Sequence, residues 1–427
     1  GRTVEFNIDK ISNAIKKAAT EEGVSLKTSQ VFDCVQKVIN YIEMTEKENI
    51  SVEEVQNLVE KALRDSGHEN IAISYSTYRK ERTKVREIKS DLMKAIQQIG
   101  YETDRDNANV GNNFSSKLLR IASESNKWHT LASMPKKLAK AHETGDLYYH
   151  DLDSYNLTTN CLHIPTREVL EKGFNTGYGT INSPKRIETA AELSCILLQS
   201  TQNDMFGGQS HPDFDNDLGI FVEPTRKEIK KELEELGVPS ERIEGILEKK
   251  VTERIHQAMQ GVVFNLNTMH SRAGSQVPFS SVNIGIPNSD DAALVCEIFL
   301  EEYEKGLGKG EQPIFPNIIF RVKEGVNREE GDPYYYLYEL ACRVAAKRMN
   351  PTFMNIDADF NKEYYDKGYM PATMGCRTYL MKNVNGEPGC KGRGNIAPTT
   401  INLPRIGLQA KGDIDKFFEL FQQRIDL

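Results

Sequence analysis

Apolar positions recur at helical spacing through the first part of the chain. The pattern predicts helices at about 10–20, 29–43 and 51–67, and a fourth that starts near residue 71. Ser51 followed by Glu54 has the spacing of a capping box, and Asn7 or Asp9 can cap the first helix. Residues 2–6 alternate as an edge strand would. We therefore expect a self-contained N-terminal unit of one strand and four helices.

Farther along, short apolar segments alternate with helical patterns. This order predicts an α/β body with its functional site at one rim of the strands. A charged stretch at 224–260, broken near 237–240, predicts an exposed helical hairpin. Polar loops and strand ends that can carry the site lie at 150–161, 272–283 and 374–395.

Composition and charge narrow the classes of protein. With 427 residues, 38% hydrophobic and 27% charged, the chain is typical of a soluble protein of two or more domains. A net charge of −8 argues against a nucleic-acid groove, although a local nucleotide pocket remains open. We expect no membrane association, because no run nears the roughly 18 apolar residues of a spanning helix. We also expect no signal peptide.

The seven cysteines are scattered and form no Cys-x-x-Cys pair. This usage suits a reducing cytoplasm and predicts neither a disulfide scaffold nor a metal site in this segment. Cys376 differs from the others because it lies between Gly375 and Arg377 in a loop rich in Gly, Asn and Pro. Two interpretations stand, a small buried hydrophobe or a reactive thiol. Three cysteines fall in predicted helices and are interpreted as structural: Cys195, Cys296 and Cys342.

A basic run at 79–86 is either the solvated end of a helix or a binding site for phosphate groups. Spaced residues near it, at 1–11, 55–60 and 75–82, resemble the ATP-cone, a small regulatory domain that binds ATP or dATP. The resemblance implies nucleotide contacts at Asn7, Lys10, Gln56 and Lys80. The family pattern has a Lys-Arg pair just before the glycine at which this sequence starts.

Four further motifs, at 272–283, 313–317, 374–378 and 392–396, resemble the anaerobic (class III) ribonucleoside-triphosphate reductases, which are glycyl radical enzymes. With the cone, the resemblance covers essentially the whole chain. It implies an α/β fold, part of a ten-stranded barrel with a central finger loop, preceded by a small, mostly helical ATP-cone. The expected domains are residues 1–92 and 93–427.

The resemblance also implies the chemistry, reduction of ribonucleoside triphosphates to 2′-deoxyribonucleoside triphosphates. Cys376 would become a thiyl radical at the fingertip and take the 3′ hydrogen of the nucleotide. Cys161 matches the family cysteine that donates a hydrogen as the 2′ hydroxyl leaves as water. Asn395 matches an asparagine of the members that use formate as reductant.

The implied substrate contacts come from three segments. They are His150, Ser280, Ser281, Asn283 and Met374. His150 has an alternative role as a partner of Asp151 or Asp153, and Met374 as core filling. Cys390 is treated as incidental, with a redox role as the alternative.

Cofactors and partners follow from the same resemblance. The family carries its radical glycine and a four-cysteine zinc site far beyond the fingertip, so we expect both outside these 427 residues and expect this segment alone not to turn over. Expected partners are a radical-SAM activating enzyme and a second copy of the chain, with higher oligomers when dATP binds. Helix 187–200 and loop 202–210 resemble the dimer region that binds a deoxynucleoside triphosphate or ATP effector.

Two other functions stay open. One is an inert nucleotide-sensing regulator built on the ATP-cone. The other is a glycyl radical enzyme that acts on a small acid or alcohol, although a cone would not be expected there. The presence of a radical glycine after paired cysteines would separate the first from an enzyme.

Overall fold

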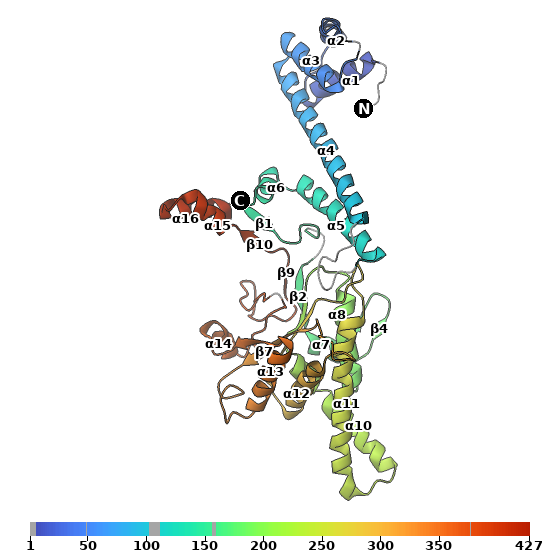
Figure 1. Cartoon of the computed structure of the whole chain (residues 1–427), viewed down its shortest axis with the longest axis vertical. Coiled ribbons are helices and arrows are strands. Elements are labelled where there is room, and N and C mark those ends of the chain that lie inside the picture. Colours follow the sequence, from blue (N-terminus) through green and yellow to red (C-terminus); the bar gives the residue numbers. More distant parts are fainter. Residues whose placement is uncertain (1–5, 48, 102–111, 156–158, 376) are drawn as a thin grey trace. The chain divides into compact units, whose positions relative to one another are not determined.

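The computed structural model describes residues 6–47, 49–101, 112–155, 159–375 and 377–427, without the side chains of 78 and 80–91. The chain divides into two compact units, Gly1–Gln98 and Ile99–Leu427 (Figure 1). The predicted boundary at 92 and 93 falls within one long helix that ends at Tyr101, and it stays a prediction.

The first unit contains the predicted helices. They are α1 (Ile8–Glu21), α2 (Thr28–Glu43), α3 (Val52–Asp65) and the start of α4 (Glu69–Tyr101). Asn7 caps α1, because its side-chain oxygen accepts from the Lys10 amide at 3.3 Å. Ser51 and Glu54 form the predicted capping box at α3. The predicted strand at 2–6 falls almost entirely outside the described residues.

Apolar residues from all four helices form the core of this unit. Ile15, Val38 and Leu63 come from three different helices and are fully buried. Burial of such side chains stabilises a fold by about 1.5–3 kcal/mol each. The amphipathic pattern that predicted the helices therefore also predicted their packing.

A six-stranded, parallel-rich sheet organises the second unit. Its order is β8-β7-β6-β5-β2-β9, and β9 alone in this sheet runs antiparallel, beside β2. The strands are β2 (Cys161–His163), β5 (Gln209–His211), β6 (Ser280–Ile284), β7 (Asn317–Val322), β8 (Thr352–Asn355) and β9 (Gly394–Asn395). The sheet curls as half of a barrel.

Helices connect the parallel strands and cover one face of the sheet (Figure 1). They are α7 (Thr166–Lys172), α8 (Ile187–Thr201), α9 (Phe214–Gly219), α10 (Val222–Glu235), α11 (Ser240–Thr268), α12 (Asp290–Lys305) and α13 (Tyr335–Arg348). Short paired strands lie outside the sheet: β1 (Leu147–Tyr149) with β10 (Thr399–Ile401), and β3 (Phe174–Asn175) with β4 (Thr180–Ile181). The other helices are α5 (Phe114–Ser133), α6 (Lys136–Glu143), α14 (Asp359–Tyr365), α15 (Leu403–Ala410) and α16 (Ile414–Ile425).

Alternation along the central strands separates two faces. Val282 and Ile284 of β6 belong to the core beneath the helices, as does Phe320 of β7. Because side chains alternate along a strand, Ser281 and Asn283 point to the opposite face. Both are fully buried, so this second face is enclosed as well as polar.

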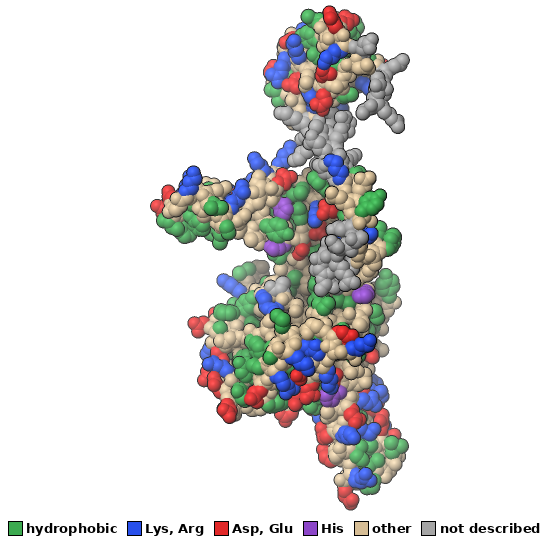
Figure 2. Space-filling model, in the orientation of Figure 1, with side chains coloured by type: hydrophobic (Ala, Val, Ile, Leu, Met, Phe, Trp, Pro, Cys, Tyr) green, Lys and Arg blue, Asp and Glu red, His purple; other side chains and the backbone are tan. Residues whose placement is uncertain are grey.

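The predicted charged hairpin is confirmed as α10 and α11. Figure 2 shows acidic and basic side chains mixed over its surface. Within the described ranges, no helix is long and apolar enough to span a membrane.

Candidate active site

The structure brings Cys161 and Asn395 together although 234 positions separate them in the sequence. They are paired in the register of β2 and β9. The Cys161 amide donates to the Asn395 side-chain oxygen at 2.8 Å, and the Asn160 amide donates to the Asn395 backbone oxygen at 2.9 Å. The Asn395 side chain is therefore held against the backbone of Cys161. The hydrogen-donor role of Cys161 and the reductant-specific role of Asn395 stay predictions.

Two glycines allow this close arrangement. A methyl group on Gly207 would come 2.8 Å from the Cys161 sulfur and closer still to Asn160. A methyl group on Gly394 would meet the Cys161 carbonyl. Neighbouring Gly208 is different, because its nearest neighbour would be 3.7 Å away, an ordinary contact. The backbone therefore packs around Cys161 on two sides.

A cavity of about 390 Å³ opens beside Cys161. This is within the range of small-molecule sites. Its lining comes from β2, β9 and several loops and includes His150, Asp151, Asn160, Cys161, Phe206, Gly207, Gly208, Arg272, Phe279, Thr378, Asn395 and Pro398. Thr378 is two positions after Cys376, so the cavity also borders the predicted fingertip loop.

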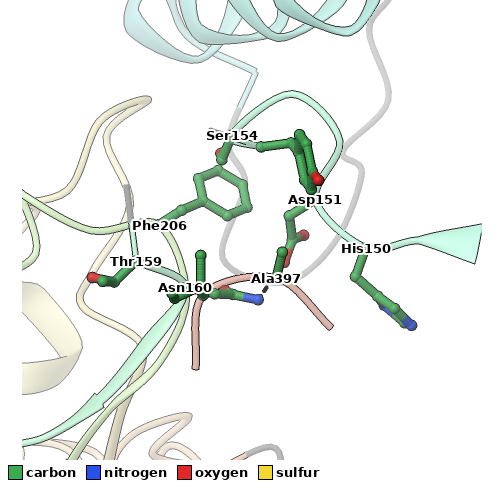
Figure 3. Close-up of a pocket in the computed structure, with 9 residues that line it drawn as sticks. His150, Asp151, Ser154, Thr159, Asn160, Phe206 and Ala397 are labelled. Carbon is green, nitrogen blue, oxygen red and sulfur yellow. Dashed lines mark hydrogen bonds between the residues drawn. The ribbon is translucent and has the colours of Figure 1, made fainter. Parts of the chain in front are cut away.

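His150 lies at the rim of this region, with Asp151, Asn160 and Phe206 around a smaller adjoining pocket (Figure 3). Its Nε2 is 2.8 Å from the Thr400 hydroxyl, and its ring meets the Tyr148 ring edge-on at 4.7 Å. Among the described residues His150 makes no hydrogen bond to Asp151 or Asp153, although its charge favours the ionised Asp151 carboxyl, so both interpretations of His150 stay predictions. The Asp151 carboxylate accepts a hydrogen bond from the side-chain amide of Asn160 at 3.0 Å. Burial raises the pKa of the Asp151 carboxyl group.

The polar residues of β6 divide into two kinds. Asn283 is fully used in holding the chain before the fingertip, since its amide donates to the Thr373 carbonyl at 3.0 Å and its oxygen accepts from the Thr373 amide at 3.1 Å. Ser281 donates to the Gln209 carbonyl at 3.1 Å. The buried Ser280 hydroxyl makes no hydrogen bond within the described part of the chain. Ser280 alternates with Ser281 and so starts on the helix side of β6, although it also lines the second cavity, and its contact with substrate stays a prediction.

A second cavity, of about 130 Å³, leads to the fingertip loop. Ser280, Ser281, Asn317 and Gly375 are in its lining. Met374 is fully buried and is not in the lining of either cavity, so its contact with substrate stays a prediction. Cys376 itself lies outside the described residues.

Arg377 makes several contacts that hold the segment after this position. The Arg377 amide donates to the Met374 carbonyl at 2.8 Å, and Arg377 has a left-handed φ of 70°. Its guanidinium donates to the Gly375 carbonyl at 2.6 Å and to the Thr352 hydroxyl at 2.8 Å. The loop is thus fastened to β8.

Sequence patterns did not single out Arg272 as a site residue, although it opens one of the quoted motifs. Its side chain is only 7% exposed and lines the larger cavity. The guanidinium lies over the Phe279 ring at 4.3 Å and the Phe206 ring at 5.0 Å. Burial lowers its pKa to about 10. A motif match marks the residue, but only the fold reveals that the charge is buried.

The other cysteines separate into core and surface. Cys195 and Cys296 are buried beneath the helices, as predicted, and burial raises the pKa of the Cys195 thiol to about 12. The prediction that Cys342 is structural is wrong, since its side chain is exposed on the outer side of α13. Cys390 is buried, and burial raises the pKa of its thiol to about 11. Among the described residues, no group of three or more His, Cys, Asp and Glu side chains is arranged to hold a metal ion.

The predicted nucleotide contacts of the first unit are described only in part. Asn7 uses its side chain as a helix cap, Lys10 is exposed, and Gln56 on α3 is half-buried. The side chain of Lys80 lies outside the described part. Their role in binding a nucleotide stays a prediction.

Comparisons with known proteins agree with this architecture. The family model "Anaerobic ribonucleoside-triphosphate reductase" matches residues 106–427, and the model "ATP cone domain" matches residues 1–84. The anaerobic ribonucleoside-triphosphate reductase of Escherichia coli (strain K12) is 30% identical over 441 residues, covering 100% of this chain and 60% of that protein. The Haemophilus influenzae protein of the same name is 30% identical over 440 residues, with the same two coverages.

A solved structure shows the same fold. The anaerobic ribonucleotide reductase from Thermotoga maritima in complex with dATP and CTP superposes with a TM-score of 0.51 and 18% identity, over 80% of this chain and 60% of that one. This likeness confirms the predicted fold class. The chain spans about 60% of the length of the curated relatives it matches. On these grounds the chain belongs to the anaerobic ribonucleoside-triphosphate reductase family and carries an ATP-cone domain at residues 1–84.

Proposed function

We propose that the full-length protein reduces ribonucleoside triphosphates to 2′-deoxyribonucleoside triphosphates by thiyl radical chemistry, with formate as reductant. The observation that carries this proposal is the pairing of Cys161 with Asn395 beside a cavity bordered by the loop of Cys376. Family membership supports the reaction class, and a thiol and an amide in the lining of one cavity support the roles proposed for Cys161 and Asn395.

In the proposed reaction Cys376 takes the 3′ hydrogen of the ribose. A thiol suits this step because its S–H bond is close in strength to the C–H bond attacked, so the transfer is reversible. Cys161 donates a hydrogen as the 2′ hydroxyl leaves as water. The overall balance is one nucleotide, one formate and one proton giving one deoxynucleotide, one carbon dioxide and one water.

The family's glycyl radical would supply the oxidising equivalent that starts each turnover at Cys376. The second cavity supports the role proposed for Cys376, because it reaches the neighbouring residue Gly375. Polar side chains of β6 and β7 also line this cavity. Ser280 is proposed to contact the nucleotide through its unbonded hydroxyl. Asn283 is proposed to act indirectly, by holding Thr373 and hence the loop.

Regulation is proposed at two places. ATP or dATP would bind the ATP-cone through Asn7, Lys10, Gln56 and Lys80, where the two lysines act as point charges on phosphates. A deoxynucleoside triphosphate effector would bind near α8 and loop 202–210 in a dimer. A radical-SAM enzyme would install the radical, and zinc is assigned to the family's C-terminal region. A cytoplasmic location goes with this chemistry.

Replacement of Cys376 by Ala tests the function. The full-length protein, activated without oxygen, should lose CTP reduction by several orders of magnitude, because Cys376 is the thiol proposed to take the 3′ hydrogen. Cys342→Ala is the matched control, because the Cys342 thiol is exposed and has no part in the proposed reaction. This variant should retain activity. Deoxynucleotide formation by the Cys376→Ala protein would contradict the proposal. Loss of activity in both variants would instead indicate general damage.

A further inference from the structure

The cavity beside Cys161 contains a buried cation without a close anionic partner. Arg272 is 7% exposed and lines the cavity. The charges of Asp151 and Asp153 act on Arg272 from a greater distance, yet no ion pair within 4.0 Å joins Arg272 to a carboxylate among the described residues. Buried charges in proteins are usually paired, because leaving water is costly for an ion. An unpaired buried guanidinium at a cavity wall therefore marks a place for an anion.

The guanidinium also has hydrogen-bond donors to spare. It carries five N–H groups. Its described bonds go to the Phe206 carbonyl at 2.5 Å and the Gln276 side-chain oxygen at 3.3 Å, both neutral acceptors. The other three N–H groups make no hydrogen bond among the described residues. A carboxylate matches this geometry because a guanidinium can hold both of its oxygens at once.

From these observations we propose that Arg272 forms a subsite for a small carboxylate beside Cys161, and that formate binds there. This inference rests on the proposed function for the identity of the anion. The subsite itself rests on the burial, the unpaired charge and the cavity.

Charge and surroundings favour a small monoanion over the triphosphate of a nucleotide. The cavity lining offers one arginine and also one aspartate, whose charge would repel a polyanion. A triphosphate carries several negative charges and is normally held by several cations or a metal ion. The Phe206 and Phe279 rings lie against the guanidinium, which is largely removed from water, and a hydrogen bond is stronger in such surroundings.

Position links the subsite to the reaction. Arg272 holds the carbonyl of Phe206, and the next residue, Gly207, packs on the Cys161 sulfur. A carboxylate bound by Arg272 would thus lie in the same cavity as the Cys161 thiol and Asn395. Arg272 is a ligand-binding residue in this account, and it also positions the loop at Cys161.

Binding of formate can be measured without turnover. The probe is ¹³C-labelled formate, followed by NMR with the unactivated full-length protein. The Arg272→Gln variant should bind formate more weakly by on the order of 10- to 100-fold, the usual range for losing a charged hydrogen-bond pair. Equal binding by the wild type and Arg272→Gln would overturn the inference, as would no binding by the wild type.

Arg348→Gln is the matched control. Arg348 is also nearly buried, at 9% exposure, but it donates to backbone carbonyls of Glu304 and Gly310 away from the cavity. This variant should bind formate as the wild type does. If Arg272→Gln fails to fold, Arg272→Lys can be used instead. Lysine keeps the positive charge but cannot make a bidentate hydrogen bond to a carboxylate, so formate binding should weaken about fivefold. Unchanged binding by a folded Arg272→Lys would also overturn the inference.

Kinetics separate this inference from the proposed function. In activated protein, Arg272→Gln should raise the KM for formate by the same factor and leave the KM for CTP within about twofold. A raised KM for CTP with an unchanged KM for formate would overturn the carboxylate subsite and leave the reductase function standing. Formate binding that depends on Arg272, in a protein that never reduces CTP, would leave the subsite standing and remove the proposed function.

Discussion

The two faces of the six-stranded sheet differ in chemistry although both are buried. The face under the helices is apolar, with Val282, Ile284 and Phe320 in one continuous core. The opposite face carries Ser281 and Asn283 and the two cavities. One sheet thus provides stability on one side and a polar site on the other, and each strand contributes to both because its side chains alternate.

Changes on the helix side should therefore affect folding, and changes on the cavity side should affect chemistry. Side chains on the helix side contribute mainly through burial. Those on the cavity side, such as Ser281 and Asn283, make specific hydrogen bonds. The predictions below test this division in order of expected effect.

The largest effect is expected on the helix side. Phe320→Ala should destabilise the full-length protein by about 3–5 kcal/mol, because it leaves a cavity in a close-packed core. The thermal unfolding midpoint measures this. Phe114→Ala is the control, since Phe114 is 78% exposed, and it should change stability by less than about 0.5 kcal/mol. Equal midpoints for the two variants would contradict the assigned core.

Gly207→Ala should be the most harmful small change on the cavity side. The added methyl group has no room beside Asn160 and Cys161, so the strand or the loop must move, at a cost of about 1–3 kcal/mol. Deoxynucleotide formation should fall by at least tenfold. Gly208→Ala adds the same group with an ordinary contact and should stay close to the wild type. Similar behaviour of the two variants would show that close packing at Cys161 does not matter.

Stability should also depend on pH through Asp217 of α9. Both carboxylate oxygens are buried without a hydrogen bond in the described part, and burial raises the pKa to about 7. Because the folded pKa lies above the usual 3.8, the folded state holds the proton more tightly, and stability should fall as pH rises from about 4 to about 7.

Asp217→Asn should remove this part of the pH dependence, on the order of 2 kcal/mol between the two ends. The measurement is the difference in thermal midpoint between the wild type and the variant across this pH range. Exposed Asp366→Asn serves as the control and should show no such trend. If the difference in thermal midpoint between the wild type and Asp217→Asn did not change with pH, the raised pKa assigned to Asp217 would be refuted.

Two adjacent serines give the smallest and most selective contrast. Ser281→Ala loses a hydrogen bond to the Gln209 carbonyl and should cost about 1 kcal/mol. Ser280→Ala loses no described bond, so stability should hold while the KM for CTP rises several-fold. Midpoint and KM measured on the same preparations check both. A destabilised Ser280→Ala protein with an unchanged KM would reverse the proposed division.

The sequence predicted the regular parts of this molecule well. Helical spacing and the Ser51 and Glu54 capping box predicted the first unit, and the charged hairpin at α10 and α11 followed from its pattern. The alternation of short apolar segments with helical patterns predicted the α/β body, and β7 is one of these segments. These signals are local, so one sequence suffices to detect them.

The site could be predicted only in outline. Resemblance named Cys161 and Asn395, but β2 and β9 have three and two residues, too few for a periodic signal, and their pairing depends on the closed fold. The burial of Arg272 and the unbonded hydroxyl of Ser280 depend on packing among distant segments. The exposure of Cys342 was missed for the same reason, because a small apolar residue fits either side of a helix.

The central claim is that the cavity face performs the chemistry and the helix face provides stability. The most direct test compares Cys161→Ala with Cys195→Ala, two buried cysteines on opposite sides of this division. Anaerobic CTP reduction by the activated full-length protein should be lost in Cys161→Ala, while Cys195→Ala, with a slightly lower midpoint, should retain it. Sustained CTP reduction by a folded Cys161→Ala protein would contradict the account.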